Sequence, residues 1–424
     1  MVELLPIFKK AYWTLAAAGL VYVGLVCSLT FPGVQRFALY ANKINPTAWQ
    51  DVNRVESFGF LIVNGTLLET QVQPFNLVTP DNETLYGWHL IPPHLCRDHE
   101  EELEANEPSG PAKDYTKTPA FKLLANDPNA RVVVSFHGNA AHLASAQRPD
   151  TYRMLLGLSE PSHPIHVFAI DYRGFGVSTG SPTEEGLITD GVSLINFLTA
   201  GPLKISPSRI VILGQSLGTA VSAAVAERFA FGSLDPSAIQ PALKDPEPFA
   251  GVILVASFSN LTNLVESYSF KGITPPILSP LMGYPRVQNW ARRHIVDRWD
   301  TTARVARLTG VGPTAQNDSS TGYASKELDL TIVHAWNDVE IPWYEGRRVW
   351  TAATGEDKRD APGTIVLQKK DVNGPNEVFL WENRSPKGTG AVKRVRWERV
   401  NFGGHNHVAT YSTAALAVLR AFEE

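Results

Sequence analysis

One stretch of the sequence decides the fold: Ile210-Val211-Ile212-Leu213-Gly214-Gln215-Ser216-Leu217-Gly218, followed by the small residues Thr219 to Ala224. The first four residues form an apolar run typical of a buried strand, and the small residues after the motif are typical of a helix. A serine between two such elements lies in a strained turn, where flanking glycines avoid collisions with neighbouring backbone. The helix N-terminus favours the negative charge that develops during nucleophilic attack. G-x-S-x-G alone arises by chance, but this setting predicts that Ser216 is a nucleophile.

Four further apolar runs repeat the pattern of a strand followed by a turn and helix-like sequence. They are Val132 to Val134, Val167 to Ile170, Val252 to Val255 and Leu330 to Val333. Strands this apolar are buried on both faces, which is typical of a parallel sheet covered by helices. The alternation of strands and helices therefore predicts an α/β fold with a mostly parallel, doubly wound sheet.

A nucleophilic serine needs a general base, and the base needs an acid that orients it. In this architecture the expected chain order is Ser, then Asp or Glu, then His. Asp338 lies on the loop that leaves the apolar strand at 330–333, and it is the predicted acid, with Glu340 as the alternative. His334, at the end of the same strand, is interpreted as a structural residue.

The predicted base lies on the loop after the strand-like run Val395 to Phe402 and before the final amphipathic helix. Two histidines are available there, His405 and His407. We prefer His405, which directly follows Gly403 and Gly404, because these glycines let the backbone pass close to the serine.

The oxyanion hole needs two backbone N–H donors. One comes from the residue after the nucleophile, here Leu217, and the other from the loop after an earlier strand. That loop is His137-Gly138-Asn139-Ala140, and we predict the amide of Asn139 as the second donor, with Ala140 as the alternative. His137 precedes the serine in the chain and is interpreted as shaping the loop.

Five segments match, in order, the α/β-hydrolase-domain serine hydrolases. They are His137-Gly138-Asn139, Asp171-Tyr172-Arg173-Gly174-Phe175-Gly176, the Ser216 motif, the Asp338 loop and Gly403-Gly404-His405-Asn406. The sequence resembles that family from about residue 58 to the C-terminus, and most of all its membrane-anchored monoacylglycerol and lysophospholipid lipases. The resemblance implies the α/β-hydrolase fold and cofactor-free hydrolysis of a lipid ester by Ser216, Asp338 and His405. It also implies that Asp171, Arg173 and Gly176 are scaffold residues.

The N-terminal segment predicts one transmembrane anchor. Residues 12–31 contain no charged side chain, and a helix of about 20 residues spans the hydrocarbon core. A cleaved signal peptide and a buried core helix are the alternatives, and the length of the apolar run favours the anchor. We expect residues 32–57 to be a linker and residues 58–424 to be the catalytic domain.

The charges beside the anchor indicate its orientation. Lys9 and Lys10 precede it and favour a cytosolic N-terminus, although Arg36, Lys43 and Arg54 after it weaken the bias. Asn-x-Ser/Thr sequons, the acceptors of N-glycans in the lumen, begin at Asn64, Asn82, Asn260, Asn317 and Asn383. We therefore expect a glycosylated catalytic domain in the lumen of the endoplasmic reticulum.

Several segments depart from the alternation of strands and helices. Residues 58–63 and 84–90 are β-rich and predict an opening antiparallel pair. Residues 259–307, rich in aromatic residues and proline, resemble a lid, and residues 355–390 predict a surface hairpin insertion. The long connection at 309–328 is a further departure from the family pattern, and with the hairpin it leaves the substrate size open.

Composition argues against nucleic-acid and metal partners. The net charge of -4 and the lack of a long run of Lys and Arg argue against a nucleic-acid partner. Cys27 and Cys96 cannot form a disulfide framework, and no paired Cys/His spacing predicts a zinc site, so we expect no metal. The oligomeric state is not predicted. Besides lipid-ester hydrolysis, two functions stay open: hydrolysis of S-acyl thioesters on proteins, and a non-catalytic binding role.

Overall fold

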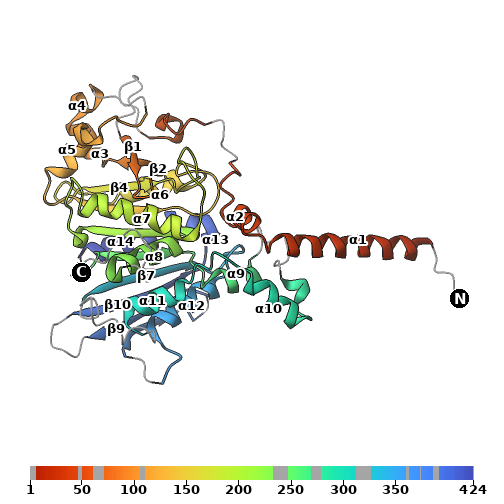
Figure 1. Cartoon of the computed structure of the whole chain (residues 1–424). Coiled ribbons are helices and arrows are strands. Elements are labelled where there is room, and N and C mark those ends of the chain that lie inside the picture. Colours follow the sequence, from red (N-terminus) through yellow and green to blue (C-terminus); the bar gives the residue numbers. More distant parts are fainter. Residues whose placement is uncertain are drawn as a thin grey trace.

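The computed structural model describes residues 6–45, 50–60, 71–105, 110–232, 247–268, 278–311, 326–359, 362–372, 374–384 and 391–423. Within these residues one sheet of ten strands forms the centre, in the order β1-β2-β4-β3-β5-β6-β7-β10-β9-β8 (Figure 1). The strands are β1 (Val72–Val78), β2 (Thr84–Leu90), β3 (Arg131–Phe136), β4 (Ile165–Ile170), β5 (Ile210–Gln215), β6 (Gly251–Val255), β7 (Leu328–Ala335), β8 (Thr364–Lys370), β9 (Glu377–Arg384) and β10 (Val392–Val400). The helices are α1 (Pro6–Ser28), α2 (Pro32–Tyr40), α3 (Pro93–Asp98), α4 (Glu100–Glu104), α5 (Pro119–Ala125), α6 (Arg148–Leu156), α7 (Glu184–Thr199), α8 (Leu217–Phe231), α9 (Leu261–Ser267), α10 (Pro285–Arg293), α11 (Thr301–Thr309), α12 (Trp343–Thr354), α13 (Gly404–His407) and α14 (Ser412–Glu423).

The middle of the sheet is parallel, as predicted. Strands β4, β3, β5, β6, β7 and β10 pair in parallel, and antiparallel strands lie at both ends. Helices cover both faces of the sheet. Successive side chains of a strand point to opposite faces, and here both sets are apolar and buried. Val132 and Val134 of β3 pack in one core with α7 and α8, whereas Val133 packs in a second core with α6 and α14. The sequence-based prediction of a doubly wound α/β-hydrolase fold is confirmed.

The opening antiparallel pair differs from the prediction. The partner of β2 is β1, at 72–78, and residues 55–58 form a short 3-10 helix instead of a strand; residues 61–63 lie outside the described part. The run of β1 contains Pro74 and Asn76, so its β-propensity is low. Proline is tolerated there because β1 is the edge strand of the sheet.

The segment expected to be a surface hairpin contains β8 and β9, which extend the sheet beyond β10. Phe379 and Trp381 of β9 are buried in the same core as Trp397 of β10. The Trp397 indole donates a hydrogen bond of 2.8 Å to Glu377. The hairpin is thus a packed continuation of the sheet.

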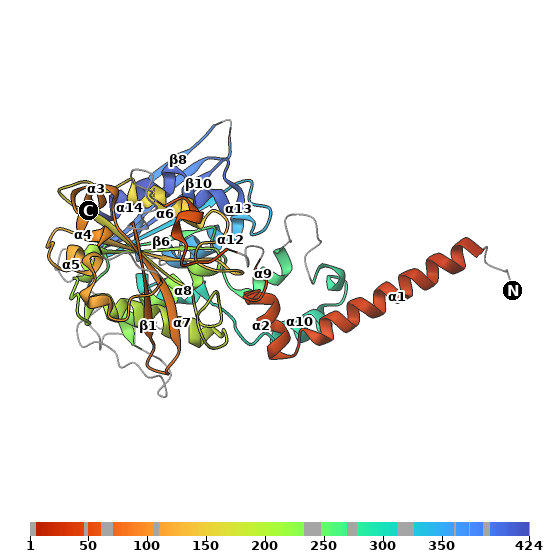
Figure 2. The ribbon, with the colours of Figure 1, turned by 90° about the horizontal axis from the view of Figure 1, so that it is seen from above.

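The apolar N-terminal segment forms α1, which begins at residue 6, earlier than the predicted start at 12, and ends at residue 28. It projects away from the rest of the molecule, and most of its apolar side chains are exposed (Figures 1 and 2). Within the described part of the chain it is the one helix long and apolar enough to cross a membrane.

The predicted linker at 32–57 is wrong, because most of it is folded against the catalytic domain. It contains α2, which starts with Pro32, a residue suited to the first turn of a helix. Tyr40, Val52 and Val55 are buried in the two main cores. The hydrolase domain therefore begins at α2.

The segment expected to be a lid also needs a new boundary. Helices α9 and α10 lie beside α2, outside the two helix layers (Figure 2). Helix α11, however, packs Val305 and Leu308 into the core formed with β6, β7 and α12. We call residues 259–298 the lid segment, of which 269–277 lie outside the described residues, as does most of the predicted connection at 309–328.

Candidate active site

Ser216 lies at a sharp turn between β5 and α8. Its backbone dihedral angles, φ 55° and ψ -120°, are rare for a residue with a side chain. The two glycines of the motif make this turn possible. A Cβ atom on Gly214 would lie 2.2 Å from the carbonyl oxygen of Gly218, and one on Gly218 would lie 2.0 Å from that of Phe136. Larger residues at these two positions would therefore collide with backbone.

The structure brings the three predicted triad residues into one hydrogen-bonded chain. His405 Nε2 lies 2.9 Å from Ser216 Oγ, and His405 Nδ1 lies 2.9 Å from Asp338 Oδ2. The three residues follow β5, β7 and β10, whose carboxyl ends meet at one edge of the parallel sheet. The arrangement has the geometry of a nucleophile, a base and an orienting acid.

Asp338 is held ionised by a full set of donors. Its Oδ1 atom accepts hydrogen bonds of 2.9 Å from the backbone N–H groups of Glu340 and Ile341. Its Oδ2 atom lies 3.3 Å from His334 Nε2, in addition to the contact with His405. Burial alone would raise the pKa of Asp338, but the interactions with His405 and His334 outweigh it and lower the pKa.

His405 is the histidine that contacts the serine, whereas His407 is exposed. Burial lowers the pKa of His405. The charge of Asp338 and its hydrogen bond raise this pKa by more than burial lowers it, and the charge of Glu340 adds to the increase. The net pKa of His405 is above its ordinary value. Glu340, the alternative acid, lines the cavity, but among the described residues it is Asp338 that hydrogen-bonds to His405. The geometry therefore favours Asp338 as the acid.

The loop at 137–141, which we call the oxyanion loop, passes directly beside the nucleophile. A Cβ atom on Gly138 would lie 3.3 Å from the Cβ of Ser216. The N–H of Ala140 donates to the carbonyl of Tyr40 at 2.8 Å, so Ala140 is not available as a donor to substrate. Asn139 and Leu217 line the cavity at Ser216, and in the described part of the chain neither N–H has an acceptor. The structure thus favours the predicted pair of donors.

The oxyanion loop is fixed from behind by Arg148, which sequence reasoning missed. This side chain is nine-tenths buried and donates to the carbonyls of Gly138 (3.1 Å), Asn139 (2.8 Å) and Ala140 (3.1 Å). Its other terminal nitrogen donates to the carbonyl of His142. One signal was available in the sequence. Arg148 is the first residue of α6, where a positive charge is unfavourable next to the helix dipole, so its presence indicates a compensating interaction.

The predicted loop-shaping residue His137 and the predicted scaffold residues Asp171 and Arg173 are all buried and in contact with neighbouring groups. His137 is buried, with Nδ1 2.6 Å from the Gly138 carbonyl and Nε2 3.5 Å from Asp171. Asp171 accepts from the N–H of Leu143 at 2.6 Å. Arg173 forms ion pairs with two carboxylates, those of Asp81 and Asp190.

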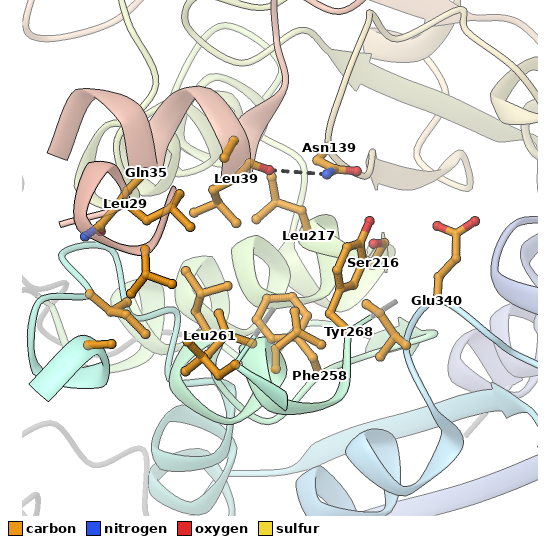
Figure 3. Close-up of a pocket in the computed structure, with 18 of the residues that line it drawn as sticks. Leu29, Gln35, Leu39, Asn139, Ser216, Leu217, Phe258, Leu261, Tyr268 and Glu340 are labelled. Atoms are coloured by element: carbon orange, nitrogen blue, oxygen red, sulfur yellow. Dashed lines mark hydrogen bonds between the residues drawn. The ribbon is translucent and has the colours of Figure 1, made fainter. Parts of the chain in front are cut away.

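A cavity of about 190 Å³ opens at Ser216, far larger than the ~30 Å³ that one water molecule occupies. Figure 3 shows Ser216 and Glu340 at one end and a series of apolar side chains extending away from them. We call this space the acyl cavity. Its lining residues are Val26, Leu29, Thr30, Gln35, Ala38, Leu39, Asn139, Ser216, Leu217, Phe258, Leu261, Leu264, Val265, Tyr268, Leu278, Ala291, Ile295, Glu340, Ile341 and His405.

Comparison with known proteins places the chain in a family. The sequence profile of the Alpha/beta hydrolase family matches residues 132–420, and the chain belongs to this family. The crystal structure of an alpha-beta hydrolase from Vibrio vulnificus covers 93% of this chain and 94% of its own, with a TM-score of 0.51 at 15% identity. That likeness concerns the fold.

Curated relatives include lipases. Lysophosphatidylserine lipase ABHD12 of Xenopus tropicalis is 24% identical over 390 residues, which cover 90% of this chain and 83% of the relative. The same-named protein of Gallus gallus is 27% identical over 277 residues, 65% of this chain and 60% of the relative. Protein ABHD12B of Homo sapiens is 41% identical, but over 91 residues, 22% of this chain and 23% of that protein.

Proposed function

We propose that this protein is a serine hydrolase that cleaves the carboxylic ester of a single-chain lipid, a lysophospholipid or a monoacylglycerol. The observation that carries the proposal is the hydrogen-bonded chain from Ser216 through His405 to Asp338, at one end of an apolar cavity. Ester hydrolysis needs the activated serine, and binding of an alkyl chain needs the apolar cavity. The lipase relatives support a lysophospholipid as the substrate.

The proposed mechanism follows from the positions of the atoms. Ser216 Oγ attacks the ester carbonyl carbon while His405 Nε2 accepts its proton, and Asp338 stabilises the imidazolium. The N–H groups of Asn139 and Leu217 hold the oxyanion. The C–O bond to the glycerol oxygen then breaks as His405 donates the proton to it. Water then attacks the acyl carbon as His405 accepts its proton. The bond from the acyl carbon to Ser216 Oγ breaks, and His405 returns the proton to Oγ, which releases the fatty acid and free serine.

Two other functions share part of this evidence. A thioester of a fatty acid with a protein cysteine would place the same acyl chain in the cavity, so an S-acylated peptide belongs in the assay. A non-catalytic binding role is disfavoured by the triad geometry, since such a role needs no serine within 2.9 Å of a base.

The test compares the full-length protein in detergent with Ser216→Ala. We expect wild type to react with a fluorophosphonate probe and to hydrolyse lysophospholipid or monoacylglycerol, whereas the variant does neither. Loss of the nucleophile lowers the rate by several orders of magnitude. Near-normal turnover by folded Ser216→Ala would remove Ser216 from the mechanism, and a preference for S-acylated peptide would change the substrate class.

Helix α1 and the relatives together suggest a membrane protein. We infer further that α1 is an uncleaved anchor in the endoplasmic reticulum and that the catalytic domain lies in the lumen. Lys9 and Lys10 before the apolar run support this orientation. The protein should then resist carbonate extraction.

The sequons provide the test of orientation. Asn82 is exposed on the turn between β1 and β2, whereas the side chain of Asn260 caps α9 by accepting from the Asn263 N–H at 2.8 Å. Asn383 is half-buried on β9, and Asn64 and Asn317 lie outside the described residues. We expect endoglycosidase to increase gel mobility, and Asn82→Gln to remove one glycan. No shift, with protease access to the domain from the cytosol, would overturn the luminal placement.

A further inference from the structure

The chain between the membrane helix and the hydrolase core lines the same cavity as the nucleophile. Six residues of the segment 26–39 belong to its wall: Val26, Leu29, Thr30, Gln35, Ala38 and Leu39. Figure 3 shows Leu29, Gln35 and Leu39 on the same side of the cavity, beyond Leu217 from Ser216. Val26 is 7% exposed, while Leu20 and Val21, one to two turns earlier in α1, are more than 70% exposed. Val26, the buried residue of α1, is thus one that lines the cavity.

Helix α2 is fixed to the active site on one side and to the lid segment on the other. The Asn139 side chain donates to the Leu39 carbonyl at 3.2 Å, and the Ala140 N–H donates to the Tyr40 carbonyl at 2.8 Å. On the lid side, Arg36 pairs with Asp297 at 3.0 Å, and the Tyr40 hydroxyl donates to the same carboxylate at 2.9 Å. Helix α2 is therefore a fixed wall of the site.

The opposite wall comes from the lid segment. Leu261, Leu264 and Val265 of α9 and Ala291 of α10 line it. Between the two walls the cavity is lined mainly by apolar groups. Ser216, His405 and Glu340 lie at one end, and Thr30 and Gln35 are polar residues of the wall at 26–39. An apolar cavity of this kind suits one alkyl chain, with its ester group at the serine.

We propose that residues 26–39 form a wall of the acyl-chain site, so that the lipid chain reaches Ser216 from the bilayer along the last turn of α1. This inference rests on the proposed hydrolysis of a single-chain lipid. It rests also on the proposed membrane anchor, in which the exposed apolar side chains of α1 lie in hydrocarbon. The end of the acyl cavity at Val26 and Leu29 therefore lies where α1 leaves the membrane. An acyl chain can then pass from the bilayer into the cavity without crossing water.

A photocrosslinking experiment on the full-length protein in lipid nanodiscs tests this directly. An alkyl fluorophosphonate that carries a diazirine at the end of a long chain is attached to Ser216, irradiated, and its adducts are mapped by peptide mass spectrometry. We expect adducts within residues 26–39. A short-chain analogue should crosslink close to Ser216 instead. Adducts of the long-chain probe confined to other segments would overturn the proposal.

A substitution tests the same wall by substrate selectivity. Ala38→Trp introduces an indole at the cavity wall, and the matched control Phe37→Trp introduces one on the exposed side of α2. We expect Ala38→Trp to lower kcat/KM for a long-chain ester about tenfold more than for an acetyl ester, since excluding two methylene groups from burial changes affinity by roughly that factor. Phe37→Trp should keep the wild-type ratio.

The outcomes separate this inference from the proposed function. Unchanged long-chain selectivity in Ala38→Trp that still reacts with fluorophosphonate would refute the acyl wall and leave the hydrolase activity intact. Wild-type protein that hydrolyses no ester at all would refute the proposed function itself. Reaction with the probe also shows that each variant is folded around Ser216.

Discussion

Replacing Arg148 by lysine should remove most of the turnover from a protein that still folds. The guanidinium holds the Gly138 carbonyl at 3.1 Å and the Asn139 carbonyl at 2.8 Å. In a trans peptide the C=O and the following N–H point in opposite directions. Holding the Gly138 carbonyl toward Arg148 therefore turns the N–H of Asn139 away from it, toward the substrate side. The second contact likewise turns the Ala140 N–H toward Tyr40.

Lysine keeps the positive charge but loses the planar fork, so it cannot hold several carbonyls together. If the Asn139 N–H leaves its position, the loss should match that of one oxyanion donor, about 10²- to 10³-fold in kcat, or about 2.7–4 kcal/mol. KM should change little, because the donor acts mainly on the transition state. The assay measures kcat and KM with a short p-nitrophenyl ester, well below the Tm of each variant. Arg153→Lys, an exposed position on the same helix, is the control.

Two results would refute this reasoning. Normal kcat in folded Arg148→Lys would show that the oxyanion loop keeps its geometry without the guanidinium. A lower Tm with normal kcat at low temperature would assign Arg148 to stability alone. A loss of kcat in Arg148→Lys cannot be assigned to loss of the buried charge, because lysine retains that charge.

Three further predictions concern histidines. His405→Ala should be as damaging as loss of the nucleophile and His407→Ala mild, and the reverse ranking in kcat would move the base. Glu340→Gln should shift the acidic limb of the kcat/KM profile to lower pH, because the carboxylate helps to raise the pKa of His405 and the base must be neutral; an unmoved limb, or one at higher pH, would contradict it. Burial lowers the pKa of His166 from 6.5 to about 3, so the unfolded chain takes up the proton first and stability falls as the pH drops below about 6.5. In His166→Gln the free energy of unfolding from urea titrations should fall less between pH 7 and 5 than in wild type, and an equal fall would assign the loss to other groups.

The parallel half of the fold could be predicted because its strands are short, apolar and buried on both faces. Strand β5 is buried at every position, and its first four residues, Ile210 to Leu213, form an uninterrupted apolar run in the sequence. The edges could not be predicted in the same way. Strand β1 contains a proline, and β8 is mostly exposed, so neither has the periodicity that identifies a strand. Their positions depend on pairing with neighbours that the sequence alone does not order.

The candidate triad could be predicted because its chemistry requires particular residue types in a fixed order, each after a core strand. His334 was assigned a structural role and does lie fully buried, yet it also contacts the carboxylate of Asp338. Arg148 was missed because its partners are backbone carbonyls, which every residue carries and no motif distinguishes. Interactions of side chains with backbone are set by the folded loop, so they become visible only in the structure.

Helix α2 shows why the interpretation as a linker failed and what depends on it. A helix of nine residues is marginal by itself in water, so neither propensity nor length distinguishes it from a loop. Its order comes from partners far away in the chain, Asp297 on the lid segment and Asn139 on the oxyanion loop. The carbonyl of Tyr40, at its end, in turn holds the N–H of Ala140. Truncation at about residue 45 would therefore remove part of the active site together with the anchor, and a soluble form that keeps the site must begin before α2.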